Sequence, residues 1–232
     1  MVLRLSPWIL GLCVLPLTAC QFLAERPDDA SQPVAEQSEA PPPPPPPVDP
    51  NAVPDLPLAD NSDVVLASIK VANLDYADET KDYGLGPVTT LLYDSLRHPT
   101  TTTVPGGEVI RTYDLVELMR KEGPKPVIVN VIPGQQARII PGAVWLSGAG
   151  RSSRLGQDDV IKRLGTHLTR LTGGNKTRPV VIYCLDNRCW YAYNAAQRAS
   201  RLGYRNVYWY RGGIKAWRSA GLPYTTAQED LW

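Results

Sequence analysis

The sequence predicts an α/β fold in which a parallel β-sheet is flanked by helices. Three short apolar runs, PVIVNVI at 126–132, PVVIY at 179–183 and NVYWY at 206–210, are typical of buried strands. The segment IIPGAVWL at 139–146 adds a turn and a further extended piece. Segments with helical periodicity lie between these runs, and strands that alternate with helices are typical of βαβ crossovers.

Four helices are expected around this sheet. The first has Thr112 as its N-cap and ends before Gly123, because a glycine-proline pair stops it there. Apolar residues at helical spacing predict a second helix over 157–171. The third spans about 189–202 and the fourth 214–220, which completes the domain.

The first 19 residues have the features of an export signal. A single early cation, Arg4, precedes an apolar stretch that is too short to span a bilayer. The following sequence LTAC resembles the lipobox of bacterial lipoproteins, which implies that Cys20 is acylated and that Cys13 leaves with the signal. By the same resemblance, Gln21 favours anchoring on the periplasmic side of the outer membrane. An ordinary secretory signal is the alternative, and export is expected in both cases.

The chain after the signal divides into three parts. Residues 20–62 are rich in Pro, Ala, Glu, Asp and Gln, with consecutive prolines from Pro41 to Pro47, and are expected to form a lipid-anchored, disordered tether. Residues 63–106 form an N-terminal extension to which no structure is assigned. Residues 107–232 carry the regular pattern of the α/β domain.

Charge and motif content exclude several function classes. The 24 basic and 23 acidic residues give a net charge of +1, which argues against a nucleic-acid surface. The two histidines, His98 and His167, have no spacing to cysteine that resembles a zinc site, and His167 is expected to be structural. Neither a haem attachment motif nor a G-x-S-x-G elbow occurs. No metal or cofactor is therefore predicted.

Only Cys184 and Cys189 remain in the part of the chain that is expected to fold, and export places them in an oxidising compartment. Cys184 directly follows the run PVVIY, and reactive groups in parallel sheets gather where strands pass into helices. The positive end of the next helix and the cation of Arg188 favour a thiolate there, whereas Asp186 opposes it. The sequence therefore predicts a reactive sulfur at Cys184.

The shape of the loop decides whether the two thiols can join. A disulfide requires Cα atoms about 4.4–6.8 Å apart. A straight strand would separate Cys184 from Cys189 by roughly 16 Å, whereas a curled loop would bring them within range. A disulfide is thus expected only if the loop forms a cradle.

Several motifs together resemble those of rhodanese-like domains. GYRNVYWYRGGIKAW at 203–217 and the following GLP look like the C-terminal signature of that family, and IIPGA looks like its Pro-Gly-Ala turn. The loop 184–189 coincides with the family's sulfur-cradling loop, which implies that Cys184 forms a persulfide. Arg188, for its charge, and Cys189, as a second thiol, are the other candidate catalytic residues, and Leu185, Asp186, Asn187 and Trp190 complete the candidate substrate loop.

A narrower resemblance is carried by PGAVWLSGAG, CLDNRCW and NAAQRASRLGYRNVYWY. These segments are similar to those of PQQ-dependent catabolism-associated CXXCW motif proteins, which are exported and linked to quinoprotein alcohol metabolism. The resemblance implies a periplasmic quinoprotein system as a partner, and any quinone cofactor would belong to that system. The cysteine spacing here is wider than the name of those proteins implies.

Three positions depart from the rhodanese pattern. Asn187 replaces a common glycine, and Asn is the residue that best tolerates left-handed backbone geometry in its place. Cys189 stands where many active members have Arg, Thr or Ser. The strand that usually ends in Asp-x-Arg ends here in 130–132, NVI, and so lacks that charged pair.

Three hypotheses remain for the site. Cys184 accepts sulfane sulfur from a small donor and Cys189 resolves the persulfide, or the pair exchanges electrons with a thiol partner without sulfane sulfur. In the third, a binding module carries the pair as a structural disulfide. Trp190 either packs over the sulfurs or belongs to the core, and Asn194 either braces the loop or is satisfied elsewhere in the core.

Overall fold

The computed structural model of the chain describes residues 70–134, 136–153, 159–228 and 232. All of them belong to one unit, Val48–Trp232. The predicted signal peptide, the acylation site Cys20 and the tether 20–62 lie outside the described residues. Among the helices of the described ranges, none is long and apolar enough to cross a membrane.

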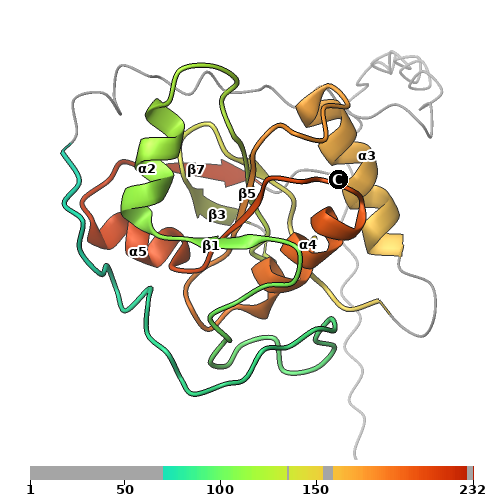
Figure 1. The fold of residues 1–232 in the computed structure, drawn as a ribbon, viewed down its shortest axis with the longest axis horizontal. Coiled ribbons are helices and arrows are strands. Elements are labelled where there is room, and N and C mark those ends of the chain that lie inside the picture. The colour runs from blue at the N-terminus through green and yellow to red at the C-terminus, as the bar shows by residue number, and fades with distance from the viewer. Residues whose placement is uncertain (1–69, 135, 154–158, 229–231) are drawn as a thin grey trace, which may run out of the picture. The chain divides into compact units, whose positions relative to one another are not determined.

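A five-stranded parallel sheet forms the centre of the domain. Its strands lie in the order β1, β6, β5, β2, β4, and the helices cover both faces (Figure 1). The predicted fold class is confirmed. The strands span Glu108–Ile110 (β1), Val127–Asn130 (β2), Val144–Trp145 (β4), Val180–Tyr183 (β5) and Val207–Tyr210 (β6).

Side chains of the central strand β5 alternate between two hydrophobic cores. Val180 and Ile182 belong to the core under helices α3 (Asp159–Thr172) and α4 (Trp190–Arg201). Val181 and Tyr183 belong to the core under α2 (Thr112–Arg120) and α5 (Gly213–Ser219). All four strand residues are buried, which explains the uninterrupted apolar run in the sequence.

A second, two-stranded sheet was not predicted. Strand β3 (Gln136–Ile139) pairs antiparallel with β7 (Thr225–Gln228), which lies near the end of the chain. The β7 sequence TTAQ has no apolar alternation, so only its distant partner identifies it as a strand.

The N-terminus of α2 differs from the prediction. Thr112 is the first residue of the helix, Arg111 is the N-cap, and the Arg111 side chain makes no capping hydrogen bond. Instead, Oε2 of Glu79 accepts hydrogen bonds from the backbone N–H of Thr112 (2.8 Å) and from its hydroxyl (2.7 Å). A carboxylate at this end of a helix is favourable, and burial raises the pKa of Glu79. The prediction of Thr112 as the N-cap was wrong because the capping group lies 33 residues earlier.

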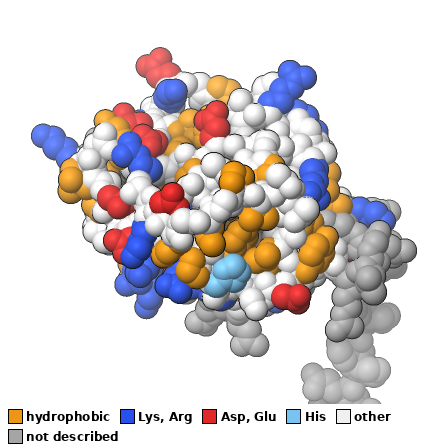
Figure 2. All heavy atoms as spheres, turned by 60° about the horizontal axis from the view of Figure 1, so that its bottom comes forward, with side chains coloured by type: hydrophobic (Ala, Val, Ile, Leu, Met, Phe, Trp, Pro, Cys, Tyr) orange, Lys and Arg blue, Asp and Glu red, His pale blue; other side chains and the backbone are white. Residues whose placement is uncertain are grey.

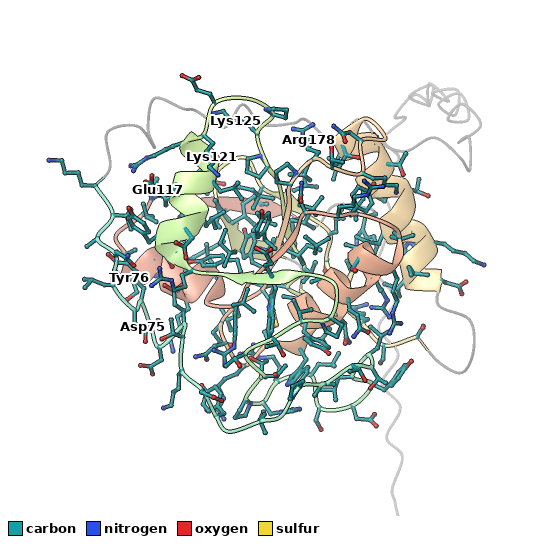
Figure 3. The ribbon with its side chains drawn as sticks, in the orientation of Figure 1. Asp75, Tyr76, Glu117, Lys121, Lys125 and Arg178 are labelled. Atoms are coloured by element: carbon teal, nitrogen blue, oxygen red, sulfur yellow. A yellow bond between two sulfur atoms is a disulfide. The ribbon has the colours of Figure 1, made fainter. Side chains whose placement is uncertain are left out.

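Two cations, Lys125 and Arg178, lie at the C-terminal ends of α2 and α3 (Figure 3). Nζ of Lys125 donates to the carbonyl oxygens of Met119 (3.1 Å) and Lys121 (3.3 Å). Arg178 donates from Nη1 to the carbonyl oxygen of Leu171 (3.0 Å) and from Nε to that of Lys125 (2.9 Å). The bonds to Met119, Lys121 and Leu171 satisfy carbonyl groups that a helix C-terminus leaves unpaired.

Residues 76–101, here called the strap, cross one end of the domain without a helix or strand. Polar side chains of α4 hold the strap in place. Asn194 donates to the carbonyl oxygen of Leu92 (2.8 Å) and accepts from its N–H (2.9 Å), and Gln197 donates to the carbonyl oxygen of Thr89 (3.0 Å). Figure 2 looks onto this end of the molecule, where hydrophobic side chains gather around a histidine. The extension with no assigned structure is thus ordered by α4 over its described part.

The environment of His167 on α3 makes the free energy of unfolding depend on pH. The side chain is 6% exposed, packs edge-on against Trp232, and its Nδ1 has no hydrogen-bond partner. Burial, then the charges of Arg170 and Arg163, lower its pKa to about 4. The folded state therefore favours neutral histidine, and stability falls as pH drops through the unfolded pKa of about 6.5 toward 4.

Replacement of His167 by leucine removes this titration. Between about pH 7.5 and about pH 4.5, we expect the wild type to lose about 2 kcal/mol more unfolding free energy than His167→Leu. Urea unfolding of both proteins at the two pH values measures the difference. Equal losses in both proteins would contradict the assignment.

Candidate functional site

The two cysteines lie where the central strand passes into a helix. Cys184 directly follows β5, and Cys189 is the N-cap residue of α4. The loop between them is curled, with a Cα–Cα separation of 6.1 Å, and the two sulfurs are joined in a disulfide. The curled loop that a disulfide required is therefore present, and both sulfurs lie at the positive end of α4.

Backbone hydrogen bonds join the first turn of α5 to the cysteine loop. The backbone N–H of Ile214 donates to the carbonyl oxygen of Cys184 (3.0 Å), and that of Lys215 donates to Leu185 (2.9 Å). Gly213 permits this approach, because a Cβ there would lie 2.5 Å from the carbonyl oxygen of Cys184. Its φ of +61° also favours glycine. The glycine pair before α5 thus has a direct structural role at the cysteine loop.

Asn187 binds the strap. Its Nδ2 donates to the carbonyl oxygen of Asp78, its Oδ1 accepts from the hydroxyl of Tyr83 (3.1 Å), and its own carbonyl oxygen accepts from the hydroxyl of Thr100 (2.7 Å). Left-handed backbone geometry occurs not at Asn187 but at Ala77, Asp78 and Ser95 of the strap. The amide therefore matters here for its hydrogen bonds and not for its conformational tolerance.

The charges of the loop are arranged differently from the sequence-based expectation. The carboxylate of Asp186, which was expected to oppose a thiolate, is paired with a cation from another segment. Arg97 of the strap donates to both of its oxygens, at 2.9 and 3.2 Å. Arg188 is exposed and lies over the ring of Tyr83, with its guanidinium carbon 5.9 Å from the centroid. The sequence spacing gave no indication of Arg97, which is 89 residues away from its partner.

The strap also pairs with the backbone at the start of α4. Arg97 and Cys189 form an isolated antiparallel β-bridge, and the N–H of Trp190 donates to the carbonyl oxygen of Leu96 (3.0 Å). Nε1 of Trp190 donates to Nδ1 of His98 (3.3 Å) and to the carbonyl oxygen of Pro99 (3.2 Å). Trp190 therefore ties α4 to the strap, and it brings His98 next to the loop.

The disulfide is closed off from solvent as a result. Cys184 is 2% exposed and Cys189 is fully buried, whereas Leu185 between them is 41% exposed. An external thiol or sulfur donor can reach either sulfur only after the strap or the loop moves.

Arg211, which follows β6, anchors the strap and was not singled out from the sequence. Its guanidinium donates to the hydroxyl (2.9 Å) and the carbonyl oxygen (3.0 Å) of Thr100, and to the carbonyl oxygens of Glu79 (2.9 Å) and Lys81 (2.8 Å). The side chain is buried, and burial lowers its pKa. The sequence does offer one signal for Arg211, which is its place directly after a buried strand. A charged side chain that is buried there needs several hydrogen-bond acceptors.

Asn130 occupies the position of the acidic residue in the Asp-x-Arg pattern. Its side chain is fully buried, and its Oδ1 accepts from the N–H of Ile132 (2.8 Å). Ile132 stands where that pattern has arginine. The amide thus braces the end of β2 without the charged pair. Within the described ranges, no group of three or more His, Cys, Asp or Glu side chains could hold a metal ion.

Comparison with known families agrees with this architecture. The family model described as Rhodanese-like domain matches residues 113–220. No curated protein matches the chain. The match includes β2, β5, β6 and the complete cysteine loop, and it supports a rhodanese-like domain at residues 113–220. Such a domain supports sulfur-transfer or thiol chemistry in general terms.

Proposed function

We propose that the protein reduces sulfane sulfur through a persulfide on Cys184 that Cys189 resolves. The observation that carries the proposal is the position of both cysteines in one loop, close enough to be joined, at the carboxyl end of β5. The match to the Rhodanese-like domain supports sulfur or thiol chemistry at that loop.

The chemistry proceeds in two balanced steps. The thiolate of Cys184 attacks the outer sulfur of a persulfide donor, so that an S–S bond forms on Cys184 and the donor leaves as a thiolate. The thiolate of Cys189 then attacks Sγ of Cys184 and expels hydrosulfide. The sulfane sulfur gains two electrons, and the cysteine pair loses two as it becomes a disulfide. A thiol partner that supplies two electrons restores the dithiol.

The position of the loop supports this sequence of steps. Both sulfurs lie at the N-terminus of α4, where the helix dipole stabilises a thiolate. The ion pair between Asp186 and Arg97 compensates the carboxylate that would otherwise oppose it. The buried disulfide is the resting oxidised form, and movement of the strap admits the reducing partner.

The proposed setting rests on the sequence alone. Acylation of Cys20 would anchor the chain on the periplasmic side of the outer membrane, and the tether 20–62 would hold the domain away from it. A small sulfur-containing donor or a thiol protein is the reaction partner, and nucleic acid is not. The narrower resemblance to CXXCW motif proteins supports an accessory role in a periplasmic quinoprotein system.

Burial of the cysteine pair favours one alternative function. A non-catalytic binding module would use the same disulfide to fix the loop to α4 and the strap, and both cysteines are buried as such a role requires. The alternative predicts that the disulfide resists mild reductants and never exchanges sulfur.

A single-turnover experiment separates the two functions. The reduced protein, freed of reductant, is mixed with cysteine persulfide, and both released sulfide and remaining thiols are measured. We expect one hydrosulfide for each disulfide that forms, because the resolving step produces the two together. Disulfide formation without sulfide would indicate plain thiol oxidation, and unchanged thiols would contradict both the persulfide and the redox function.

A further inference from the structure

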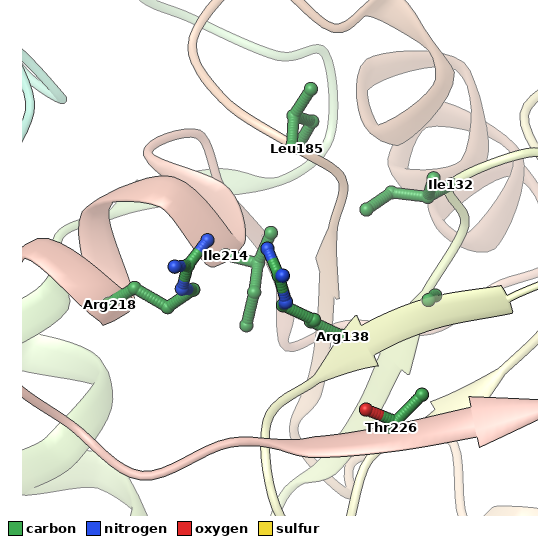
Figure 4. A pocket seen from close by; sticks show the side chains of 7 residues that line it. Ile132, Arg138, Leu185, Ile214, Arg218 and Thr226 are labelled. Carbon is green, nitrogen blue, oxygen red and sulfur yellow. The ribbon is translucent and has the colours of Figure 1, made fainter.

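A hollow of about 400 Å³ lies beside the cysteine loop (Figure 4). Ile132, two residues after β2, Leu185 of the loop and Ile214 of α5 give it apolar walls. Arg138 of β3 and Arg218 of α5 extend into it from opposite sides, and their guanidinium groups lie on either side of Ile214 in this view. The hollow thus combines an apolar lining with two cations.

The two arginines have no acidic partner among the described residues. Each instead lies against the ring of Tyr224, with guanidinium carbons 5.7 Å (Arg138) and 5.1 Å (Arg218) from the same centroid. Both guanidinium groups therefore lie beside one aromatic ring, and both line the same hollow. Two like charges that line one hollow without an acidic partner favour the entry of an anion.

We propose that this hollow binds a small organic carboxylate with an apolar body. The planar guanidinium matches a carboxylate in a bidentate geometry, and two of them favour an anion strongly over a neutral group. Ile132, Leu185 and Ile214 cover the apolar part of the ligand, which distinguishes it from an inorganic anion. The bound molecule would contact Leu185, the residue directly after Cys184. The inference does not depend on sulfur chemistry at the cysteines.

Titration of the full chain with hexanoate and with phenylacetate tests the site. Methyl NMR resonances of Ile132, Leu185 and Ile214 are expected to shift saturably with both probes. Arg138→Gln and Arg218→Gln are each expected to weaken binding about tenfold or more, because each removes a charge-assisted hydrogen bond. The double variant should abolish it. Arg205→Gln is the matched control, since this exposed arginine precedes β6 at the opposite end of the strands.

The uncharged analogue hexanamide separates charge from apolar contact. We expect hexanamide to bind at least about tenfold more weakly than hexanoate. Equal affinity for the two would overturn the proposal, because the arginines would then contribute nothing. No saturable shift with either carboxylate, or the same affinity in wild type and both arginine variants, would also overturn it. Retained dispersion of the methyl spectrum shows that each variant is folded.

Discussion

Cys184→Ser is expected to reduce sulfide release from cysteine persulfide to the rate measured without protein. A serine hydroxyl cannot attack the outer sulfur of the donor, so no persulfide forms and Cys189 has nothing to resolve. The measurement is sulfide production under excess donor with a dithiol reductant present, which keeps the wild type cycling.

Cys189→Ser is the matched control, since it removes the other sulfur of the same bond. This variant should still accept sulfur on Cys184, but it should release hydrosulfide only when an external thiol replaces the missing one. Full activity in Cys184→Ser together with inactivity in Cys189→Ser would reverse the assigned roles. Wild-type activity in both variants would contradict a persulfide site in this loop.

Arg211→Met is expected to detach the strap from the cysteine loop. Four hydrogen bonds from the guanidinium are lost, and the carbonyl oxygens of Glu79, Lys81 and Thr100 remain without this donor. We expect a loss of about 3 kcal/mol or more in unfolding free energy. The rate at which a dithiol reduces the Cys184–Cys189 bond should rise about tenfold or more, because local opening becomes easier.

A control for global destabilisation is needed here. Leu168 on α3 is fully buried in the core and makes no hydrogen bond to the strap through its side chain, and Leu168→Ala costs about 2–5 kcal/mol by cavity formation. In Leu168→Ala, the rate at which a dithiol reduces the Cys184–Cys189 bond should stay close to that of the wild type. Equal acceleration in both variants would show that global unfolding, and not the strap, controls access. Thr100→Val, a milder change at the same contact, should give an intermediate rate.

The parts of the fold that could be predicted are those determined locally. The runs at β2, β5 and β6 are buried on both faces, so their sequences are apolar without interruption. Helix α4 ends at Arg201, one residue before its predicted end, and Gly203 follows with a φ of +87°. Such signals lie within a few residues of the element that they define.

The parts that could not be predicted depend on distant partners. Strand β7 exists because it pairs with β3, and the N-terminus of α2 is capped by Glu79 of the strap. The strap itself contains no periodic pattern and is held by Asn194 and Gln197. Buried amides on α4 were the available signal, because a helix that buries polar side chains needs partners from another segment.

The cysteine loop was recognised from its place after a buried strand, but its surroundings were not. Sequence spacing identified Cys184 and Cys189 as a pair that only a curled loop could join, and the structure supplied the curl. It did not indicate that Arg97 neutralises Asp186 or that the strap buries both sulfurs. These contacts join residues that lie far apart in the chain, and no local periodicity encodes them.

The most direct test of the central claim is the intact mass of the Cys189→Ser variant after treatment with cysteine persulfide. Because the resolving thiol is absent, the persulfide on Cys184 should persist. We predict a gain of one sulfur atom that a reductant removes and that is absent when Cys184 is also replaced by serine. An unchanged mass, with Cys184 still a free thiol, would contradict sulfane-sulfur chemistry at this site.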